Sequence, residues 1–177
     1  GVCLLVRDQA AESFFHWLET NPTESTQAQC ILALENLGNP HNIGAIMRVA
    51  AHFGVKAVVV KDAGLARSGA AIRTAEGGAD HVRLLEADDF ERMLAACRRE
   101  GYTVVSTSSH QGTNLFETAL PARAVILFGQ ETKGLSPNLQ DSSDLKVRIP
   151  GTQNVESLNV SVATGILLAD YWRHHAR

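Results

Sequence analysis

The chain has 177 residues, of which 45% are apolar and 20% are charged. This length suffices for one domain with a hydrophobic core, and the composition excludes a largely disordered chain. The charges nearly balance, with 16 basic and 19 acidic residues and a net charge of −3. The longest apolar runs, such as 57–60 and 125–128, are far shorter than the roughly 20 residues that a membrane span needs. We therefore expect no membrane association.

The cysteines Cys3, Cys30 and Cys97 are far apart and odd in number. This spacing argues against a disulfide framework and against a structural zinc site. The simplest compartment for such a chain is the reducing cytoplasm. The histidines show no zinc-binding spacing, so no metal site is predicted.

Apolar runs and helical periodicity alternate along the chain. A helix is expected over 8–18, ended by Asn21-Pro22-Thr23, and a polar stretch follows it. From there we expect strands at 30–34, 57–60, 82–84, 102–106, 124–128 and 145–149, and helices at 42–53, 70–75, 88–99 and 157–173.

Strand and helix in alternation, with nearly continuous apolar strands, predict an α/β fold with a mainly parallel sheet flanked by helices. Residues 1–29 are interpreted as a leader or linker, or the remnant of an upstream domain. Residues 30–177 are expected to form the functional domain. In such a sheet, ligands bind in the loops after the carboxyl ends of the strands.

The stretch 41–73 is locally basic and could meet phosphate, although a solvated mixed surface is the simpler interpretation. This stretch contains a single acidic residue, Asp62, and five basic residues: Arg48, Lys56, Lys61, Arg67 and Arg73.

Three loop motifs carry the unusual chemistry. The first is Asn39-Pro40-His41-Asn42-Ile43-Gly44 followed by Arg48, in which Asn42 is expected to cap a helix. The second is Gly129-Gln130-Glu131-Thr132-Lys133-Gly134, directly after an expected strand, where glycine would let the backbone approach a ligand. The third runs from Ile149-Pro150-Gly151 to Ser157-Leu158-Asn159 and on into the last helix. Taken singly, they could be a helix cap, an ordinary turn and a capped terminal helix.

Taken together, the three motifs resemble the SpoU (TrmH-type) family of RNA ribose methyltransferases, within the SPOUT superfamily. The resemblance covers about residues 30–175. The stretch from Ser68 to Ala79 is similar to a bacterial branch of tRNA/rRNA methyltransferases.

The resemblance implies an α/β domain whose C-terminal part forms a trefoil knot, with the knot loops binding S-adenosyl-L-methionine. It places Gly129, Ile149 and Leu158 at the cofactor, with Thr107 and Gly151 nearby. Ile149 and Leu158 would flank the adenine.

The resemblance also implies methyl transfer to a ribose 2′-OH of tRNA or rRNA, without a metal, and a set of catalytic positions. Arg48 is the assigned base in such enzymes, but lowering a guanidinium pKa from about 13 to about 7 costs about 8 kcal/mol. A fixed cation that holds a phosphate and stabilises the forming alkoxide is the more economical role. Asn42 would orient Arg48, and Glu131 would orient neighbouring groups. Ser157 and Asn159 would position the ribose or the arginine.

A homodimer through the C-terminal helix is expected, because Leu158 to Trp172 is too apolar for one buried stripe. Ser161, Gly165 and Ala169 form a row of small residues along it. In the family this contact places one subunit's arginine near the other's cofactor.

Three other interpretations stay open at this point. They are a catalytically silent RNA-binding relative, a methyltransferase acting on a base or another non-ribose target, and an unrelated nucleotide-binding α/β enzyme.

Overall fold

The computed structural model describes residues 11–21, 27–152 and 154–175. Its strands are β1 (Glu12–Ser13), β2 (Gln29–Leu34), β3 (Ala57–Val60), β4 (Arg83–Glu86), β5 (Thr103–Thr107), β6 (Thr113–Asn114), β7 (Arg123–Phe128) and β8 (Leu145–Arg148). Its helices are α1 (Phe14–Thr20), α2 (Pro40–His52), α3 (Gly69–Ala75), α4 (Phe90–Arg99), α5 (Pro137–Asp141) and α6 (Val160–His175). Two 3₁₀ turns lie at Gly78–Asp80 and Leu115–Glu117.

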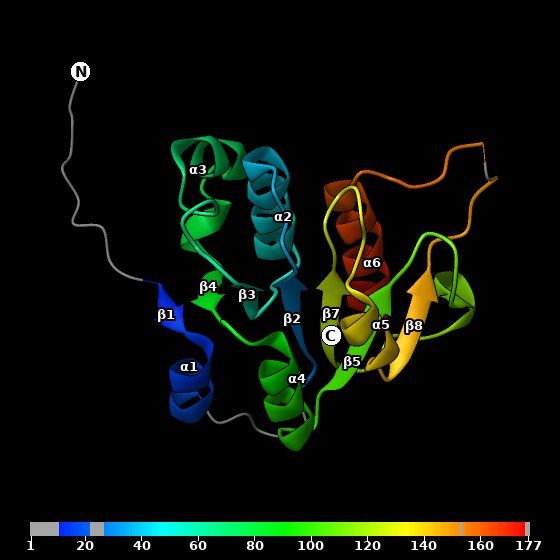
Figure 1. Ribbon diagram of the computed structural model, residues 1–177, viewed down its shortest axis with the longest axis horizontal. Helices are drawn as coiled ribbons and strands as arrows, with labels where there is room; N and C mark the ends of the chain where they lie inside the picture. The colour runs from blue at the N-terminus through cyan, green and yellow to red at the C-terminus, as the bar shows by residue number, and fades with distance from the viewer. Residues whose placement is uncertain (1–10, 22–26, 153, 176–177) are drawn as a thin grey trace.

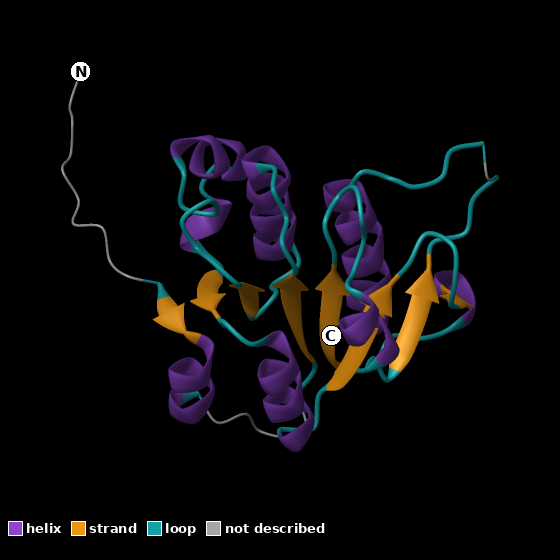
Figure 2. Ribbon diagram, in the orientation of Figure 1, coloured by secondary structure: helices purple, strands orange, loops and turns teal. Residues whose placement is uncertain are grey.

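The strands form one sheet in the order β1-β4-β3-β2-β7-β5-β8-β6, and every described pair is parallel. Helices α2, α3 and α6 cover one face, and α1, α4 and α5 cover the other (Figures 1 and 2). The expected α/β fold with a parallel sheet is thus confirmed. The trefoil knot stays a prediction.

The pleat of β2 explains why its apolar run is continuous. Cys30, Leu32 and Leu34 belong to the core under α2 and α6, whereas Ile31 and Ala33 belong to the core under α1 and α4. A strand covered by helices on both faces must be apolar at every position. Cys30 and Cys97 are both buried as free thiols, and burial raises the pKa of Cys97 to about 12.

Helix α2 begins earlier than expected. Its cap is Asn39, whose side chain accepts a hydrogen bond from the His41 amide at 2.9 Å, and Pro40 occupies the first turn. The prediction that Asn42 caps this helix is therefore wrong. Proline lacks an amide hydrogen and suits the first helical position, which fixes the start at residue 40. Asn42 is left inside the helix, with its side chain free for other partners.

The last helix begins later than expected, at Val160 instead of 157. Asn159 Oδ1 accepts from the Ser161 amide at 2.9 Å, so Asn159 acts as the cap. Ser157 therefore lies in the loop between β8 and α6, beside the carboxyl edge of the sheet.

Part of the expected leader, residues 1–29, is packed into the folded unit. The strand β1 pairs with β4 at the edge of the sheet, and Phe14 and Trp17 of α1 are buried. Of the helix expected over 8–18, residues 8–10 lie outside the described residues. The rest of that prediction is partly wrong, because residues 12–13 form β1 and the helix runs from Phe14 to Thr20. The division into a leader and a functional domain at residue 30 stays a prediction.

Among the described residues, the helices are all too short or too polar to span a bilayer.

Candidate functional site

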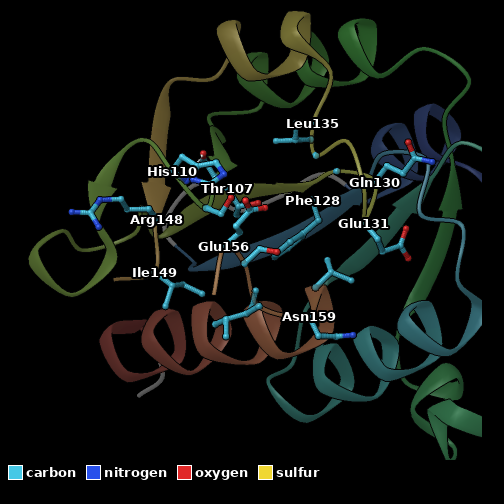
Figure 3. Close-up of a pocket in the computed structure, with 18 of the residues that line it drawn as sticks. Thr107, His110, Phe128, Gln130, Glu131, Leu135, Arg148, Ile149, Glu156 and Asn159 are labelled. Carbon is cyan, nitrogen blue, oxygen red and sulfur yellow. Dashed lines mark hydrogen bonds between the residues drawn. The ribbon is translucent and has the colours of Figure 1, made fainter. Parts of the chain in front are cut away.

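A cleft of about 1460 Å³ opens at the carboxyl ends of β5, β7 and β8. Residues at and between the end of β8 and the start of α6 contribute to its lining, among them Ile149, Glu156 and Asn159 (Figure 3). All but one of the site residues predicted from the sequence line it: Asn42, Thr107, Gly129, Glu131, Ile149, Gly151, Ser157, Leu158 and Asn159. The exception is Arg48. The strand-end rule thus located the cleft.

A chain of hydrogen bonds joins the three motifs at one wall of the cleft. Asn42 Nδ2 donates to Glu131 Oε1 at 3.0 Å, and Asn159 Nδ2 donates to Asn42 Oδ1 at 3.0 Å. Asn159 Oδ1 in turn accepts from the Ser161 hydroxyl at 2.7 Å. Asn42 is buried and both of its amide atoms are used, so it holds a carboxylate from one loop and an amide from another. An ionised carboxylate could not replace it, because a carboxylate accepts hydrogen bonds but donates none.

Glu131 has further donors in the loop before α2. The amides of Gly38 and Asn39 lie 3.2 and 3.3 Å from its carboxylate oxygens. Partial burial alone would raise the pKa of Glu131, but the hydrogen bonds from Asn42 and these backbone amides outweigh it and lower the pKa below 4.5. The cleft therefore holds a fixed negative charge at neutral pH, which suits a cationic ligand.

The loop after β7 is a tight turn that needs glycine for its own packing. The Gly134 amide donates to the Gln130 carbonyl at 2.8 Å, and Gly134 has a φ of +71°. A Cβ at Gly129 would overlap the backbone of Gly134 and Leu135. The packing of the turn is thus sufficient by itself to require glycine at this position, and contact of Gly129 with a ligand stays a prediction. The close contact is made by the returning chain.

The residues predicted to bind the cofactor differ in whether their side chains are already used within the protein or are open to a ligand. Thr107 Oγ1 donates to the Leu127 carbonyl at 2.8 Å, so its hydroxyl ties β5 to β7. Leu158 is 45% exposed and belongs to neither hydrophobic cluster of the described residues. A Cβ at Gly151 would meet nothing within 4 Å. Ile149 and Leu158 therefore offer an apolar wall beside open space.

Arg48 lies elsewhere on the molecule. It is six residues beyond Asn42, which places it on a different side of α2. Its Nη1 lies 2.9 Å from Glu76 Oε2, and both side chains are more than half exposed. Within one protomer, Arg48 and the cleft are thus separate.

The sequence analysis missed several residues of the cleft, among them His110, Phe128, Arg148 and Glu156. Figure 3 shows His110 beside Thr107, whereas the Arg148 side chain extends away from the other labelled residues. His110 follows Thr107-Ser108-Ser109 directly after β5. A polar loop at the end of a central strand was the available signal, and the same strand-end rule would have found it.

Comparison with known proteins agrees with this site. Residues 29–169 match the SpoU rRNA Methylase family. The chain belongs to this family. A tRNA/rRNA methyltransferase, YfiF of Escherichia coli O157:H7, is 51% identical over 99% of this chain and 50% of its own length. A 23S rRNA (guanosine-2′-O-)-methyltransferase, RlmB of Burkholderia sp, is 35% identical over 92% of this chain and 66% of its own length. The chain thus spans about half to two thirds of these curated relatives.

Solved structures share the fold. The AdoMet-bound rRNA methyltransferase of Sinorhizobium meliloti superposes with a TM-score of 0.82 at 23% identity, covering 96% of this chain and 63% of that one. The A. aeolicus TrmH/SpoU tRNA modifying enzyme has a TM-score of 0.74 at 28% identity, covering 90% of this chain and 83% of that one. The family resemblance drawn from the three motifs is confirmed.

Proposed function

We propose that this chain is the catalytic domain of an RNA 2′-O-ribose methyltransferase that uses S-adenosyl-L-methionine and acts on tRNA or rRNA. The observation that carries the proposal is the hydrogen-bonded chain from Glu131 through Asn42 to Asn159, which joins all three motifs at one cleft. Support also comes from the relatives, whose names specify tRNA/rRNA methylation and guanosine 2′-O-methylation.

The cleft fits S-adenosyl-L-methionine in size and in chemistry. Its volume exceeds the few hundred cubic ångströms that a small ligand occupies, which leaves room for a nucleotide beside the cofactor. Ile149 and Leu158 supply apolar surface for the adenine, with open space over Gly151. The Glu131 carboxylate supplies a negative charge for a cationic ligand. When bound, the cofactor would supply the methyl group.

The protein's own groups would align the ribose and stabilise charge. Arg48 would hold an RNA phosphate and, as a fixed cation, stabilise the 2′-oxygen while the hydroxyl proton passes to solvent water. Asn159 would position the ribose from the start of α6, with Asn42 and Glu131 fixing its orientation. Ser157 is exposed beside it and could contact the ribose directly. Alignment of this kind supplies much of the rate enhancement in a displacement reaction.

A homodimer through α6 would bring Arg48 to a cleft. Helix α6 buries Leu167, Leu168 and Tyr171 in its own protomer. A second apolar face stays accessible and runs along positions three or four apart: Val162, Ile166, Ala169 and Trp172. Of these, Val162 and Trp172 are each 52% exposed. We call this face the α6 stripe.

Two of the small residues expected to let the α6 helices of a dimer approach closely have partners within their own protomer. Gly165 lies beside Val49 of the same chain, at 3.9 Å from its Cγ1 to a built Cβ, and the Ser161 hydroxyl bonds Asn159. Gly165 therefore faces α2 of its own protomer, where a Cβ would make only an ordinary van der Waals contact. The proposed dimer therefore rests on the α6 stripe and on the separation of Arg48 from its own cleft.

The test has two arms. Calorimetry should show binding of S-adenosyl-L-methionine or S-adenosylhomocysteine, with neither NAD nor ATP competing. Incubation with radiolabelled cofactor and total RNA from cells lacking the gene should label RNA, and mapping should place the label on ribose 2′-oxygens. The cytoplasm, where tRNA and rRNA are found, is the expected compartment.

The outcomes separate the alternatives. Absence of cofactor binding would contradict the proposal altogether. Cofactor binding without labelled RNA would favour a silent RNA-binding relative, and label on a base would favour the non-ribose reaction.

A further inference from the structure

Glu76 stands out in the backbone of the described residues. It has a φ of +46°, and Asn36 is the other non-glycine residue with a positive φ in the described part of the chain. Asparagine tolerates this conformation, but glutamate has no local hydrogen bond that favours it. Residues held in such a conformation are kept there by their surroundings, often at functional sites. Glu76 is the C-cap of α3, where a left-handed residue commonly ends a helix, but that residue is usually glycine or asparagine and not glutamate.

The turn that holds Glu76 is built against Arg48. Glu76 ends α3, and Gly77 follows with a φ of +83°, so the chain reverses within two residues. A Cβ at Gly78 would lie 2.7 Å from the Arg48 Cα and 3.2 Å from its amide nitrogen. Only glycine lets this turn touch α2 so closely. The turn places the Glu76 carboxylate at Arg48 Nη1, at 2.9 Å.

The pair occupies one corner of the guanidinium fork. Glu76 takes Nη1, and no bond from Arg48 Nε or Nη2 to another described residue is present. A guanidinium carries five N–H donors in a rigid plane, so fixing one corner orients the others. An exposed arginine without such a partner would sample many rotamers. The free edge of Arg48 is thus presented to solvent in a defined direction.

We propose that Glu76 is a positioning residue that orients Arg48 for phosphate and alkoxide contact. This inference rests on the proposed function, because Arg48 is the cation of that reaction. Glu76 itself touches neither RNA nor cofactor in the proposal. It acts through Arg48, by restricting the guanidinium while leaving its remaining donors free.

The test uses the full chain with Glu76→Gln and Glu76→Gly. Glutamine keeps an acceptor but loses the charge, and glycine removes the side chain while relieving the positive φ. Glu91→Gln is the matched control, since Glu91 is an exposed glutamate on α4 at the opposite face of the sheet. Single-turnover methylation of total RNA from cells lacking the gene should slow about fivefold in Glu76→Gly, the factor that corresponds to about 1 kcal/mol. Glu76→Gln should fall between Glu76→Gly and the wild type, and Glu91→Gln should not change.

Three readouts separate positioning from a structural role. The thermal midpoint of Glu76→Gly should equal or exceed that of the wild type, because glycine adopts a positive φ without strain. The KM for RNA should not rise, because the substitution removes a negative charge. In an Arg48→Ala background, Glu76→Gly should have no further effect on the rate.

A measurement without RNA decides the inference even if no RNA is labelled. Rotation of the Arg48 guanidinium about its Nε–Cζ bond, followed by NMR, should be several-fold faster in Glu76→Gln than in the wild type or in Glu91→Gln. Unchanged rotation would overturn the inference, as would faster rotation with an unchanged methylation rate. Failure of the wild type to label RNA would instead overturn the proposed function.

Discussion

Asn42 links two loops that are far apart in the sequence. Its amide nitrogen serves Glu131 and its amide oxygen accepts from Asn159, both at 3.0 Å. Its buried position makes each unpaired partner costly, because a buried polar group without a hydrogen bond loses its water as well. The geometry of the candidate site and part of the stability of the fold therefore depend on the same side chain.

Asn42→Ala should lower the free energy of unfolding by about 1–3 kcal/mol, the cost of leaving buried polar groups unpaired. Asn42→Asp should cost more at neutral pH, since it places a second carboxylate against Glu131, and part of the loss should be recovered as the pH falls. Urea unfolding measures both. Asn39→Ala is the control, because it removes a cap worth about 1 kcal/mol without touching this chain of bonds. Equal effects of Asn39→Ala and Asn42→Asp at every pH would contradict the assignment.

The lowered pKa of Glu131 makes a prediction about acid stability. A carboxyl with a lower pKa in the folded state stabilises the fold fully above its ordinary pKa, near 4.5, and loses this contribution as the pH falls through the lowered value. Glu131→Gln should therefore flatten the decline in unfolding free energy below about pH 4.5. Glu156→Gln, a change at an exposed cleft glutamate without a described hydrogen-bond partner, should leave the decline as it is. Urea unfolding between pH 7 and pH 3 tests this, and parallel curves for both variants would rule it out.

Arg48 gives a prediction about the reaction itself. As the proposed cation, Arg48→Ala should leave cofactor affinity nearly unchanged and slow methyl transfer by about 10² or more, the effect of losing one oxyanion donor. Arg48→Lys should recover only part of the rate, because lysine keeps the charge but loses the planar fork. Single-turnover rates between pH 7 and pH 10 distinguish this role from that of a base. If Arg48 were the base, lysine would do as well or better at high pH.

At the scale of elements, α6 has two apolar faces and a single protomer covers one of them. Val162→Asp should place a charge on the exposed N-terminal end of the α6 stripe and convert a dimer to a monomer, as measured by light scattering at micromolar concentration. Ile72→Asp is the matched control, because Ile72 is an exposed apolar residue on α3 outside the stripe. A wild type that is already monomeric, or a Val162→Asp variant that stays dimeric, would show that α6 does not carry the contact.

The sequence predicted the central strands correctly but not the first residues of two helices. The apolar runs of β2, β3 and β7 were predicted because strands covered on both faces leave no ambiguity in pattern. The starts of α2 and α6 were wrong because each loop offers two polar candidates for the cap, and no local pattern decides between them. In α2 the cap is Asn39 and not Asn42, and in α6 it is Asn159 and not Ser157. The strands β1 and β6 have two residues each, too few for any periodicity.

The candidate site was predicted in part for similar reasons. Residues at the ends of strands converge by the geometry of a parallel sheet, so the cleft followed from the order of elements. The bond between Asn42 and Glu131 and the pair of Arg48 with Glu76 depend on loop conformation, which no local pattern encodes. Gly129 lines the cleft, and the packing of the turn adds a requirement for glycine that the sequence pattern did not show.

At the scale of the whole molecule, the N-terminal helix is part of the core. Phe14 is fully buried among residues of β3, β4 and α4. Phe14→Ala should therefore lower the unfolding free energy by about 3–5 kcal/mol, the usual cost of removing a buried aromatic ring. Phe15→Ala should cost much less, since Phe15 is partly exposed beneath Arg92. Denaturant unfolding distinguishes this from a detachable leader, for which both changes would be nearly neutral.

The strand order also determines how the chain reaches its fold. The strand β7 joins β2 of one half-sheet to β5 of the other, and its partner β2 was made long before it. During synthesis, β2 therefore stays an open apolar edge until β7 emerges, and unpaired edges of this kind invite aggregation. Contacts between distant segments also slow folding. We therefore expect the nascent chain to be most prone to aggregation in the interval between the synthesis of β2 and that of β7.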